Sequence, residues 1–276
     1  MTSIPFSVIM PVYKGDRPDH FYEALKSIED QTLRANEVVI IQDGPVLPEH
    51  LEVLEEFKGR MPELNHVVLK ENQGLSGALN AGVDAARYNW LARMDADDIC
   101  RKDRFEKQMD YIERHPELHL LGSWIEEYDE NMEAFLGVRK LPETHSQILR
   151  YARWRCPFNH MTILYRKDTL VKLGKYKNYG AVGDDYELWA RFLVNGYQTA
   201  NVQENLVKAR TGMAFFGTRR RGMKYLKNEM REINDLKRLG LINGFQWMIH
   251  ALVKSVVRLS PSWLVKGVYR MLRKSS

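Results

Sequence analysis

The first half of the chain alternates between short apolar runs and longer segments whose apolar residues recur every three or four positions. The short runs predict buried strands, and the three-to-four spacing predicts helices. We therefore expect strands at 6–10, 37–41 and 67–70, a fourth strand leading into Trp90–Arg93, and helices at 19–31, 48–60 and 78–87. Strict alternation of strand and helix predicts an α/β fold with a doubly wound, mostly parallel sheet and helices on both faces.

The second half of the chain is less regular. The expected elements are a helix at 101–115, a strand at 118–128, a polar hairpin leading through Pro142, a helix near 147–154, a loop entering a strand over 157–165, a helix after Asp184 and a helix near 223–239. We expect a catalytic domain at 1–207, divided near residue 100, followed by a helical extension at 208–276.

Three polar sites follow separate predicted strands: Asp43, Asn72 and the cluster Asp95–Asp98. The carboxyl ends of parallel strands lie at one edge of the sheet, where ligands bind, so these sites should converge. The segment 72–77 is expected to be a glycine-containing loop that opens a helix. Its N–H groups either bind an anion or simply cap that helix.

The cluster at 95–98 places three carboxylates within four residues. Such a group is costly to hold unless it binds a cation or stays in water. Asp95-x-Asp97 at a strand end offers the hard oxygen ligands that suit Mg²⁺ or Mn²⁺ shared with a substrate phosphate. Short acidic clusters usually belong to solvated turns, so the metal hypothesis depends on the surrounding motifs.

Two further positions allow alternative interpretations. Asp184 and Asp185 follow a glycine-rich loop; either both only favour the start of a helix, or one caps it while the other points into a cleft as a general base. His160 is a metal or phosphate contact in one interpretation and a structural residue in the other, which is commoner for a lone histidine.

Together these stretches resemble the family 2 glycosyltransferases of the GT-A type, and the resemblance covers about 200 residues. The matching motifs, in order, are Val8–Tyr13, Asp43-Gly44, Asn72–Ser76 with Ala78–Gly82, Arg93–Asp98 and Gly183–Trp189. The family implies a GT-A fold and transfer of a sugar from a nucleotide diphosphate donor, with UDP-sugars favoured, to an acceptor hydroxyl with inversion at the anomeric carbon.

The resemblance also implies residue roles. Asp185 would be the general base, Asp97 would coordinate Mn²⁺ or Mg²⁺ on the diphosphate, and Asp95 would contact the ribose or the metal. The implied substrate-binding residues are Pro11, Val12 and Tyr13 around the base and ribose, Asp43 on the base, Asn72 and Gly77 near the nucleotide, and Arg93 and Asp184 beside the acids. The chain departs from the family pattern at Gln42-Asp43, where two acids are frequent, and at Asp184-Asp185, where Glu-Asp is commoner.

Two other functions are alternatives to glycosyl transfer. A sugar-nucleotide nucleotidyltransferase shares the α/β scaffold, but a glycine-rich phosphate loop is then expected after the first strand, and residues 11–15 do not form one. A non-catalytic binding module at a membrane surface has no need of a base, so the acids at Asp43, Asp95, Asp97 and Asp185 count against it.

Charge is unevenly distributed. The net charge is +5, yet residues 208–276 carry 16 Lys and Arg against 3 Asp and Glu, whereas residues 1–207 carry 25 against 33. Residues 245–273 form two amphipathic segments broken at Pro261, with Trp247, Leu252, Val256 and Leu259 expected on one face of the first segment and Trp263, Val268, Met271 and Leu272 on one face of the second.

This basic extension predicts either an in-plane membrane anchor or a helix pair packed on the domain. We favour the anchor, because a lipid-linked saccharide acceptor would lie in the same membrane. The last 32 residues contain six basic residues, Lys254, Arg258, Lys266, Arg270, Arg273 and Lys274, and no acid. Nucleic acid is not expected as a partner, since no recognition motif accompanies the charge.

Cys100 and Cys156 lack disulfide or metal-ligand spacing, which favours a reducing compartment. No signal peptide and no apolar run of membrane-spanning length are recognised. We therefore expect a cytoplasmic protein, peripheral on the inner face of the cell membrane.

Overall fold

The structure is a computed structural model that describes residues 4–179, 184–211 and 222–259, apart from the side chains of Asp184 and Lys224. Within these residues the strands form one sheet in the order β3-β2-β1-β4-β8-β6-β9-β5, with β7 paired to β6. The strands are β1 (Phe6–Val12), β2 (Glu37–Gln42), β3 (Leu64–Val68), β4 (Trp90–Arg93), β5 (Ile99–Cys100), β6 (Leu118–Tyr128), β7 (Phe135–Arg139), β8 (Leu164–Arg166) and β9 (Gln198–Arg210).

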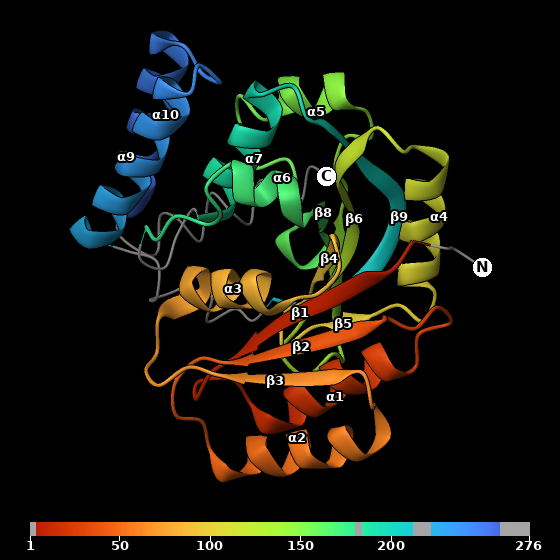
Figure 1. Cartoon of the computed structure of the whole chain (residues 1–276). Helices are drawn as coiled ribbons and strands as arrows, with labels where there is room; N and C mark the ends of the chain where they lie inside the picture. The colour runs from red at the N-terminus through yellow and green to blue at the C-terminus, as the bar shows by residue number, and fades with distance from the viewer. Residues whose placement is uncertain (1–3, 180–183, 212–221, 260–276) are drawn as a thin grey trace.

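Helices cover both faces of this sheet (Figure 1). They are α1 (Pro18–Glu29), α2 (Pro48–Arg60), α3 (Gly74–Ala85), α4 (Arg104–Arg114), α5 (His145–Tyr151), α6 (Lys167–Lys172), α7 (Asp184–Val194), α9 (Met223–Arg238) and α10 (Gly244–Leu259), with a short 3-10 helix at His160–Thr162. The predicted α/β class, with helices on both faces and a helical extension, is confirmed.

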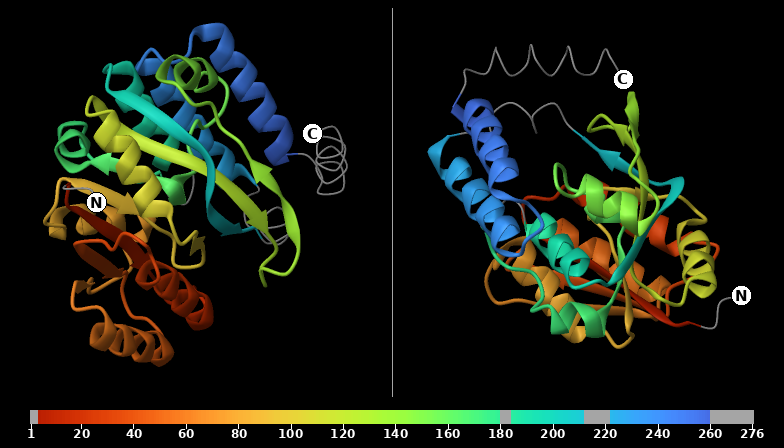
Figure 2. Two further views of the ribbon diagram at one scale, coloured as in Figure 1. Left: turned by 90° about the vertical axis from the view of Figure 1, so that its right-hand side faces the viewer. Right: turned by 90° about the horizontal axis from the view of Figure 1, so that it is seen from above.

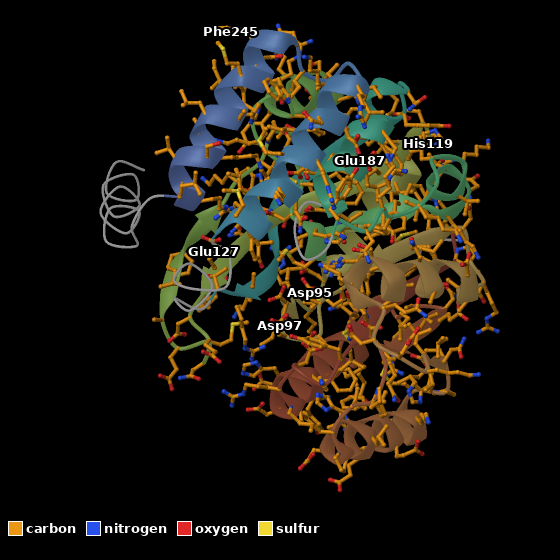
Figure 3. The ribbon with its side chains drawn as sticks, turned by 90° about the vertical axis from the view of Figure 1, so that its left-hand side faces the viewer. Asp95, Asp97, His119, Glu127, Glu187 and Phe245 are labelled. Carbon is orange, nitrogen blue, oxygen red and sulfur yellow. The ribbon has the colours of Figure 1, made fainter. Side chains whose placement is uncertain are left out.

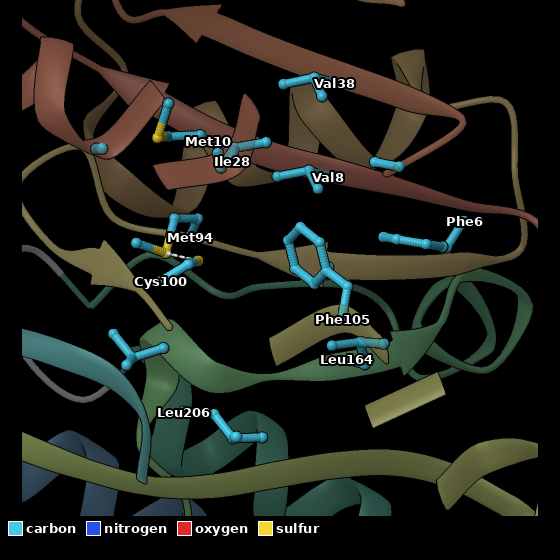
Figure 4. Close-up of a cluster of buried hydrophobic side chains, with 14 of the residues drawn as sticks. Phe6, Val8, Met10, Ile28, Val38, Met94, Cys100, Phe105, Leu164 and Leu206 are labelled. Atoms are coloured by element: carbon cyan, nitrogen blue, oxygen red, sulfur yellow. Dashed lines mark hydrogen bonds between the residues drawn. The ribbon is translucent and has the colours of Figure 1, made fainter. Parts of the chain in front are cut away.

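The central strands β1, β2 and β4 are mostly apolar because both of their faces are buried. Val8 and Met10 of β1 pack with Phe105 of α4 and with residues of α1 in one core cluster, part of which is drawn in Figure 4. Ile9, between them in sequence, faces the opposite way and packs with Leu79 of α3 in a second cluster. Because successive side chains of a strand point to opposite faces of the sheet, β1 contributes residues to two separate hydrophobic cores.

Parallel pairing holds for the first four strands and mixed pairing beyond them. β1 pairs in parallel with β2 and β4, and β2 with β3, so these strands end at one edge as expected. β8 runs antiparallel to both β4 and β6, whereas β6 and β9 run side by side in parallel over most of their length (Figure 2).

Several predicted boundaries were wrong. β1 continues through Pro11 to Val12; its pairing with β4 ends at Ile9, so the missing proline N–H lies beyond that ladder. β3 begins at Leu64, three residues before the predicted start, because it pairs with β2 from Val38 onward. α3 begins at Gly74, so Gly77 lies inside the helix and not in a loop.

Three elements were not predicted: β5, α6 and β9. The omission of β9 has the largest consequence, since it pairs with both β6 and β5. It also runs three residues past residue 207, where the expected catalytic domain ends. The division into a catalytic domain and a basic extension stays a prediction.

The described part of the basic extension is a helical hairpin. α9 packs on α7, and α10 packs on α9 (Figures 1 and 2). Trp247 points into this hairpin and donates its Nε1–H to Asn234 Oδ1 at 2.8 Å. The prediction that Trp247 shares one face with Leu252, Val256 and Leu259, which are exposed, was therefore wrong. The second predicted segment, with Trp263, Val268, Met271 and Leu272, lies outside the described residues.

Candidate active site

Three carboxylates meet at the carboxyl end of β4. One oxygen each from Asp95, Asp97 and Asp98 lies within 4.8 Å of the others. In Figure 3, Asp95 and Asp97 lie where the N-terminal half of the sheet meets the rest of the molecule. The acidic cluster predicted from the sequence is therefore a spatial cluster as well as a run of residues.

Arg93 holds Asp95 from the last position of β4. Its Nη1 donates to Asp95 Oδ2 at 2.6 Å and its Nη2 donates to Asp95 Oδ1. Arg93 is 1% exposed, and its Nε has no hydrogen-bond partner among the described residues. Arg93 hydrogen-bonds both carboxylate oxygens of Asp95. The carboxylates of Asp97 and Asp98 receive no hydrogen bond from Arg93.

Arg210, the last residue of β9, fixes the other end of the acidic loop. Its backbone N–H donates to Asp98 Oδ1 at 2.9 Å, and its guanidinium donates to the carbonyl oxygen of Asp97 and to the carboxylate of Glu23. Sequence analysis missed this residue because β9 was not recognised. The loop is thus positioned by a residue 113 positions away in the chain.

Mutual repulsion and burial shape the titration of these acids. Burial, with the neighbouring Asp95, raises the pKa of Asp97 to about 6. Burial, with Asp97 and Asp95, raises the pKa of Asp98 well above its usual range. The buried Asp98 Oδ2 has no hydrogen-bond partner among the described residues. A bound proton or a bound cation would reduce the repulsion between these carboxylates and the cost of burying their charge.

Asp16 is a fourth acid that sequence analysis did not single out. It accepts a hydrogen bond from Tyr13 N at 2.9 Å, and burial raises its pKa to about 7, with the charges of Asp97 and Asp95 contributing. Its position just after the first strand was a signal that it would share the edge of the sheet with Asp43 and Asp95.

The end of β1 forms one wall beside this cluster. Pro11 and Val12 are buried, whereas Tyr13 is 38% exposed. A Cβ on Gly15 would lie 2.5 Å from the Tyr13 ring, so glycine allows that ring to fold over the turn. The three predicted substrate-binding residues are therefore adjacent to the acidic cluster through Asp16, with only Tyr13 offering an exposed side chain.

Asp43 and Asn72 meet between the end of β2 and the start of α3. Asp43 Oδ1 accepts from Gln73 N at 2.6 Å, and Asn72 Nδ2 donates to the Asp43 carbonyl oxygen at 3.2 Å. Burial raises the pKa of Asp43, although N–H donors from Gln73 and Gly74 oppose it. Asp43 and Asn72 are therefore brought together as predicted, and one oxygen of Asp43 caps α3.

Asp185 lies in the first turn of α7. Its Oδ2 is 3.6 Å from Cys156 Sγ, which can donate a weak hydrogen bond. Burial raises the pKa of Asp185, whereas the Tyr186 N–H, the Arg93 charge and Cys156 lower it. Arg93 thus acts electrostatically on Asp185 as well as on the acidic cluster. α7 begins at Asp184, whose side chain lies outside the described residues, as do residues 180–183.

His160 belongs to an aromatic cluster and not to the acidic one. Its Nε2 lies 3.0 Å from Tyr176 OH, and its ring packs edge-on to Trp189. Burial, reinforced by Arg93, lowers its pKa well below the usual range. The Asn80 side chain holds the Tyr176 backbone: its Nδ2 donates to the Tyr176 carbonyl oxygen at 2.9 Å, and its Oδ1 accepts from Tyr176 N at 3.0 Å. This geometry favours the structural interpretation of His160.

The acidic cluster suits a divalent cation. It supplies only carboxylate oxygens, the donors preferred by Mg²⁺ and Mn²⁺, and it contains the unsatisfied buried oxygen of Asp98. Asp97 is the carboxylate that neither Arg93 nor the Arg210 backbone occupies. The residues present therefore fit the metal that the sequence implied.

Comparison with known proteins gives a consistent picture. The sequence profile described as "Glycosyl transferase family 2" matches residues 7–179. The amylovoran biosynthesis glycosyltransferase AmsE of Erwinia amylovora is 37% identical over 272 residues, which covers 98% of this chain and 99% of that protein. The UDP-Gal:alpha-D-GlcNAc-diphosphoundecaprenol beta-1,3-galactosyltransferase of Escherichia coli is 34% identical over 265 residues, covering 96% of this chain and 95% of that protein.

A solved structure shares the fold. The mannosyltransferase PcManGT from Pyrobaculum calidifontis, determined in complex with GDP-Man and Mn²⁺, superposes with a TM-score of 0.64 at 16% identity and covers 96% of this chain and 73% of that one. At this level of identity the comparison supports the fold alone.

Proposed function

This chain belongs to glycosyltransferase family 2, and from that premise we propose that it transfers a sugar from a nucleotide diphosphate-sugar to an acceptor hydroxyl with inversion at the anomeric carbon. We favour a UDP-sugar donor and a lipid-linked saccharide acceptor in polysaccharide synthesis. The names of the two relatives support this choice, since one includes UDP-Gal and a diphosphoundecaprenol acceptor and the other amylovoran biosynthesis.

The observation that carries the proposal is the link of one buried arginine, Arg93, to acids of both candidate sites. It binds Asp95 of the acidic cluster directly, and its charge also lowers the pKa of Asp185. An enzyme of this kind needs a site for the donor diphosphate near a base for the acceptor, and the link through Arg93 supports assigning these two roles to the acidic cluster and to Asp185.

On the donor side, Asp97 would hold the metal, with Asp95 either sharing it or contacting the ribose. A divalent cation bound there would neutralise charge that grows on the leaving diphosphate. The nucleoside would lie along Pro11, Val12 and Tyr13. Asp43 would recognise the base and Asn72 would border it, while Gly77, now within α3, is a weaker candidate for direct contact.

On the acceptor side, Asp185 would accept the proton of the attacking hydroxyl. The hydroxyl oxygen forms its bond to the anomeric carbon on the face opposite the diphosphate, and the bond from that carbon to the phosphate oxygen breaks. A single displacement inverts the centre and needs no covalent nucleophile. Positioning and charge stabilisation then supply most of the acceleration.

Peripheral attachment to the inner face of the cell membrane, in the cytoplasm, is part of the proposal. No helix in the described part of the chain is long and apolar enough to cross a bilayer. Of the six basic residues in the last 32 positions, Lys254 and Arg258 form ion pairs with α9, and the other four lie outside the described residues.

The family membership favours glycosyl transfer over nucleotidyl transfer. The presence of both Asp97 and Asp185 supports catalysis over a binding-only module, which has no need of a base. We keep neither alternative as a second proposal.

The test uses the purified full-length protein with a panel of UDP- and GDP-sugars, Mn²⁺ or Mg²⁺, and a short-chain lipid diphosphate saccharide as acceptor. We expect nucleotide diphosphate release and transfer from one donor, lost in Asp97→Ala and Asp185→Asn and retained in Asp110→Asn, an exposed acid of α4. Calorimetric Mn²⁺ titration should show weaker binding only for Asp97→Ala. Full activity of Asp185→Asn would refute the proposed base.

A further inference from the structure

α10 carries a continuous exposed apolar face. Its members are Phe245 (64% exposed), Met248 (55%), Leu252 (64%), Val253 (54%), Val256 (53%) and Leu259 (57%). Their spacing of three or four residues places most of them along one side of the helix. Figure 3 labels Phe245 at the edge of the molecule, at one end of α10. We refer to these six residues as the α10 apolar face.

The charged residues of α10 turn the other way. Lys254 Nζ lies 3.2 Å from Glu232 Oε2, and Arg258 Nη2 lies 2.8 Å from Glu229 Oε1, both acids belonging to α9. α10 contains no Asp or Glu. The α10 apolar face is therefore free of charge, and a contiguous surface of this kind marks a contact site in a folded protein.

A tryptophan with neighbouring cations borders this face. His250 of α10 has its Nε2 2.9 Å from the Arg153 carbonyl oxygen, and its ring stacks with Trp154 at 5.9 Å between centroids. Trp154 is 46% exposed, and the nearby Arg150, Arg153 and Arg155 are exposed as well. Val253 of the apolar face lies one helical turn from His250, so the two surfaces adjoin.

We propose that the α10 apolar face and Trp154 insert into the headgroup layer of an anionic lipid bilayer, with α10 lying parallel to the membrane surface. Three observations favour lipid over a protein partner. The face is apolar with arginines beside it, which complements anionic headgroups above acyl chains. Tryptophan is suited to that boundary. The chain continues beyond Leu259 for 17 residues that include Lys266, Arg270, Arg273 and Lys274 and no acid.

This assignment revises how the extension would meet a membrane. The basic residues of α10 stabilise the helical hairpin, and the apolar residues are the ones that contact lipid. α9 lies between α10 and α7, whose first turn carries Asp185. The inference rests on the proposed function in one respect: the membrane contact would hold the acceptor side of the site near a lipid-linked substrate.

The experiment measures flotation of the full-length protein with vesicles of phosphatidylcholine alone or mixed with phosphatidylglycerol. We expect binding to the anionic vesicles, reduced about tenfold or more in the double variant Leu252→Gln with Val256→Gln, because inserted apolar area sets the affinity. Val68→Gln, which removes an equally exposed valine of β3, should bind as the wild type does. Trp154→Ala should weaken binding to a smaller extent.

The outcomes separate this inference from the proposed function. Transfer to a water-soluble acceptor should be unchanged in the double variant, whereas transfer to acceptor embedded in vesicles should fall with binding. Wild-type binding to vesicles by the double variant would overturn the inference, even if the enzyme is active. A second result would also overturn it: the wild-type protein does not bind vesicles but forms dimers, and the double variant is monomeric. The α10 apolar face would then join two copies of the chain.

Discussion

The two terminal nitrogens of Arg93 each donate a hydrogen bond to a different carboxylate oxygen of Asp95, and the pair lies at the end of a buried strand. Arg93 is almost completely buried, while Asp95 is partly exposed toward the acidic cluster. The arginine therefore fixes the orientation of the first aspartate of the Asp95-x-Asp97 motif, and its charge acts on the remaining acids.

Arg93→Lys should impair catalysis strongly although the charge is kept. A lysine ammonium cannot match the two-pronged geometry of a guanidinium, so Asp95 would be free to rotate. We expect kcat/KM for the donor to fall by about tenfold or more, which corresponds to about 1.4 kcal/mol. Steady-state kinetics measure this, and Arg87→Lys, an exposed arginine paired to Glu37, serves as the control. Unchanged donor kinetics in Arg93→Lys would contradict a positioning role.

Gly44→Ala should destabilise the corner where Asp43 meets Asn72. Gly44 has φ = +79°, and a Cβ there would lie 2.6 Å from Asn72 N. The substitution should cost about 1–3 kcal/mol and weaken nucleotide binding. Chemical denaturation and nucleotide titration measure the two effects.

The matched control for Gly44→Ala is Gly59→Ala in α2. A Cβ at Gly59 meets nothing within 4 Å, so alanine should raise the free energy of unfolding by about 0.5–1 kcal/mol. Equal effects of the two alanines would show that the Gly44 corner is not constrained.

Cys156 should tune the proposed base. A carboxylate base works when deprotonated, so kcat/KM should rise as pH rises through the pKa of Asp185. The Cys156 thiol lowers that pKa against the effect of burial. Cys156→Ala should therefore move the rising limb of the pH profile to higher pH, and Cys156→Ser, which keeps a donor, should leave it in place or move it to lower pH. A profile identical in all three proteins would exclude the contact.

Two acids of α9 should affect the pH dependence of stability in opposite directions. Burial raises the pKa of Glu232 to about 7, despite the opposing charge of Lys254. Burial also acts on Glu229, but hydrogen bonds from Arg258 and the charge of Lys254 outweigh it and lower that pKa.

The signs follow from proton binding. The folded state binds more protons at Glu232 than the unfolded state, so its contribution to stability declines as pH rises from about 4.5 to about 7. Glu229 contributes stability above its unfolded pKa and loses it as pH falls. Glu232→Gln should therefore shrink the loss of thermal stability between about pH 5 and pH 8, and Glu229→Gln should lower stability at about pH 8. Thermal unfolding at both pH values measures this, and the same response in both variants would contradict it.

The sequence predicted the elements whose apolar spacing was strong. Helix α2 and strand β6 match their predicted ranges, because their patterns were not interrupted. β9 was missed because it carries buried polar residues. Asn201, for example, is fully buried and donates to the carbonyl oxygens of Pro142 and Pro157, partners that no local pattern reveals.

The candidate site shows the same division. Asp43, Asn72 and the acidic cluster could be placed at one edge of the sheet because parallel topology brings strand ends together. Arg210 and Cys156 could not be assigned to the site from the sequence, because each reaches it through contacts between distant segments. The apolar face of α10 was recognised in part, but Lys254 and Arg258 were expected to face a membrane and instead pair with α9.

The position of Arg210 limits how this protein can be divided. Its side chain joins α1 to the acidic loop, and it is also the last residue of β9. A fragment ending at residue 207 would keep Asp95, Asp97 and Asp98 and lose the residue that holds the last two in place. Chimeras that exchange C-terminal regions between relatives should therefore be joined after residue 211, so that the acidic loop keeps the Arg210 of its own chain.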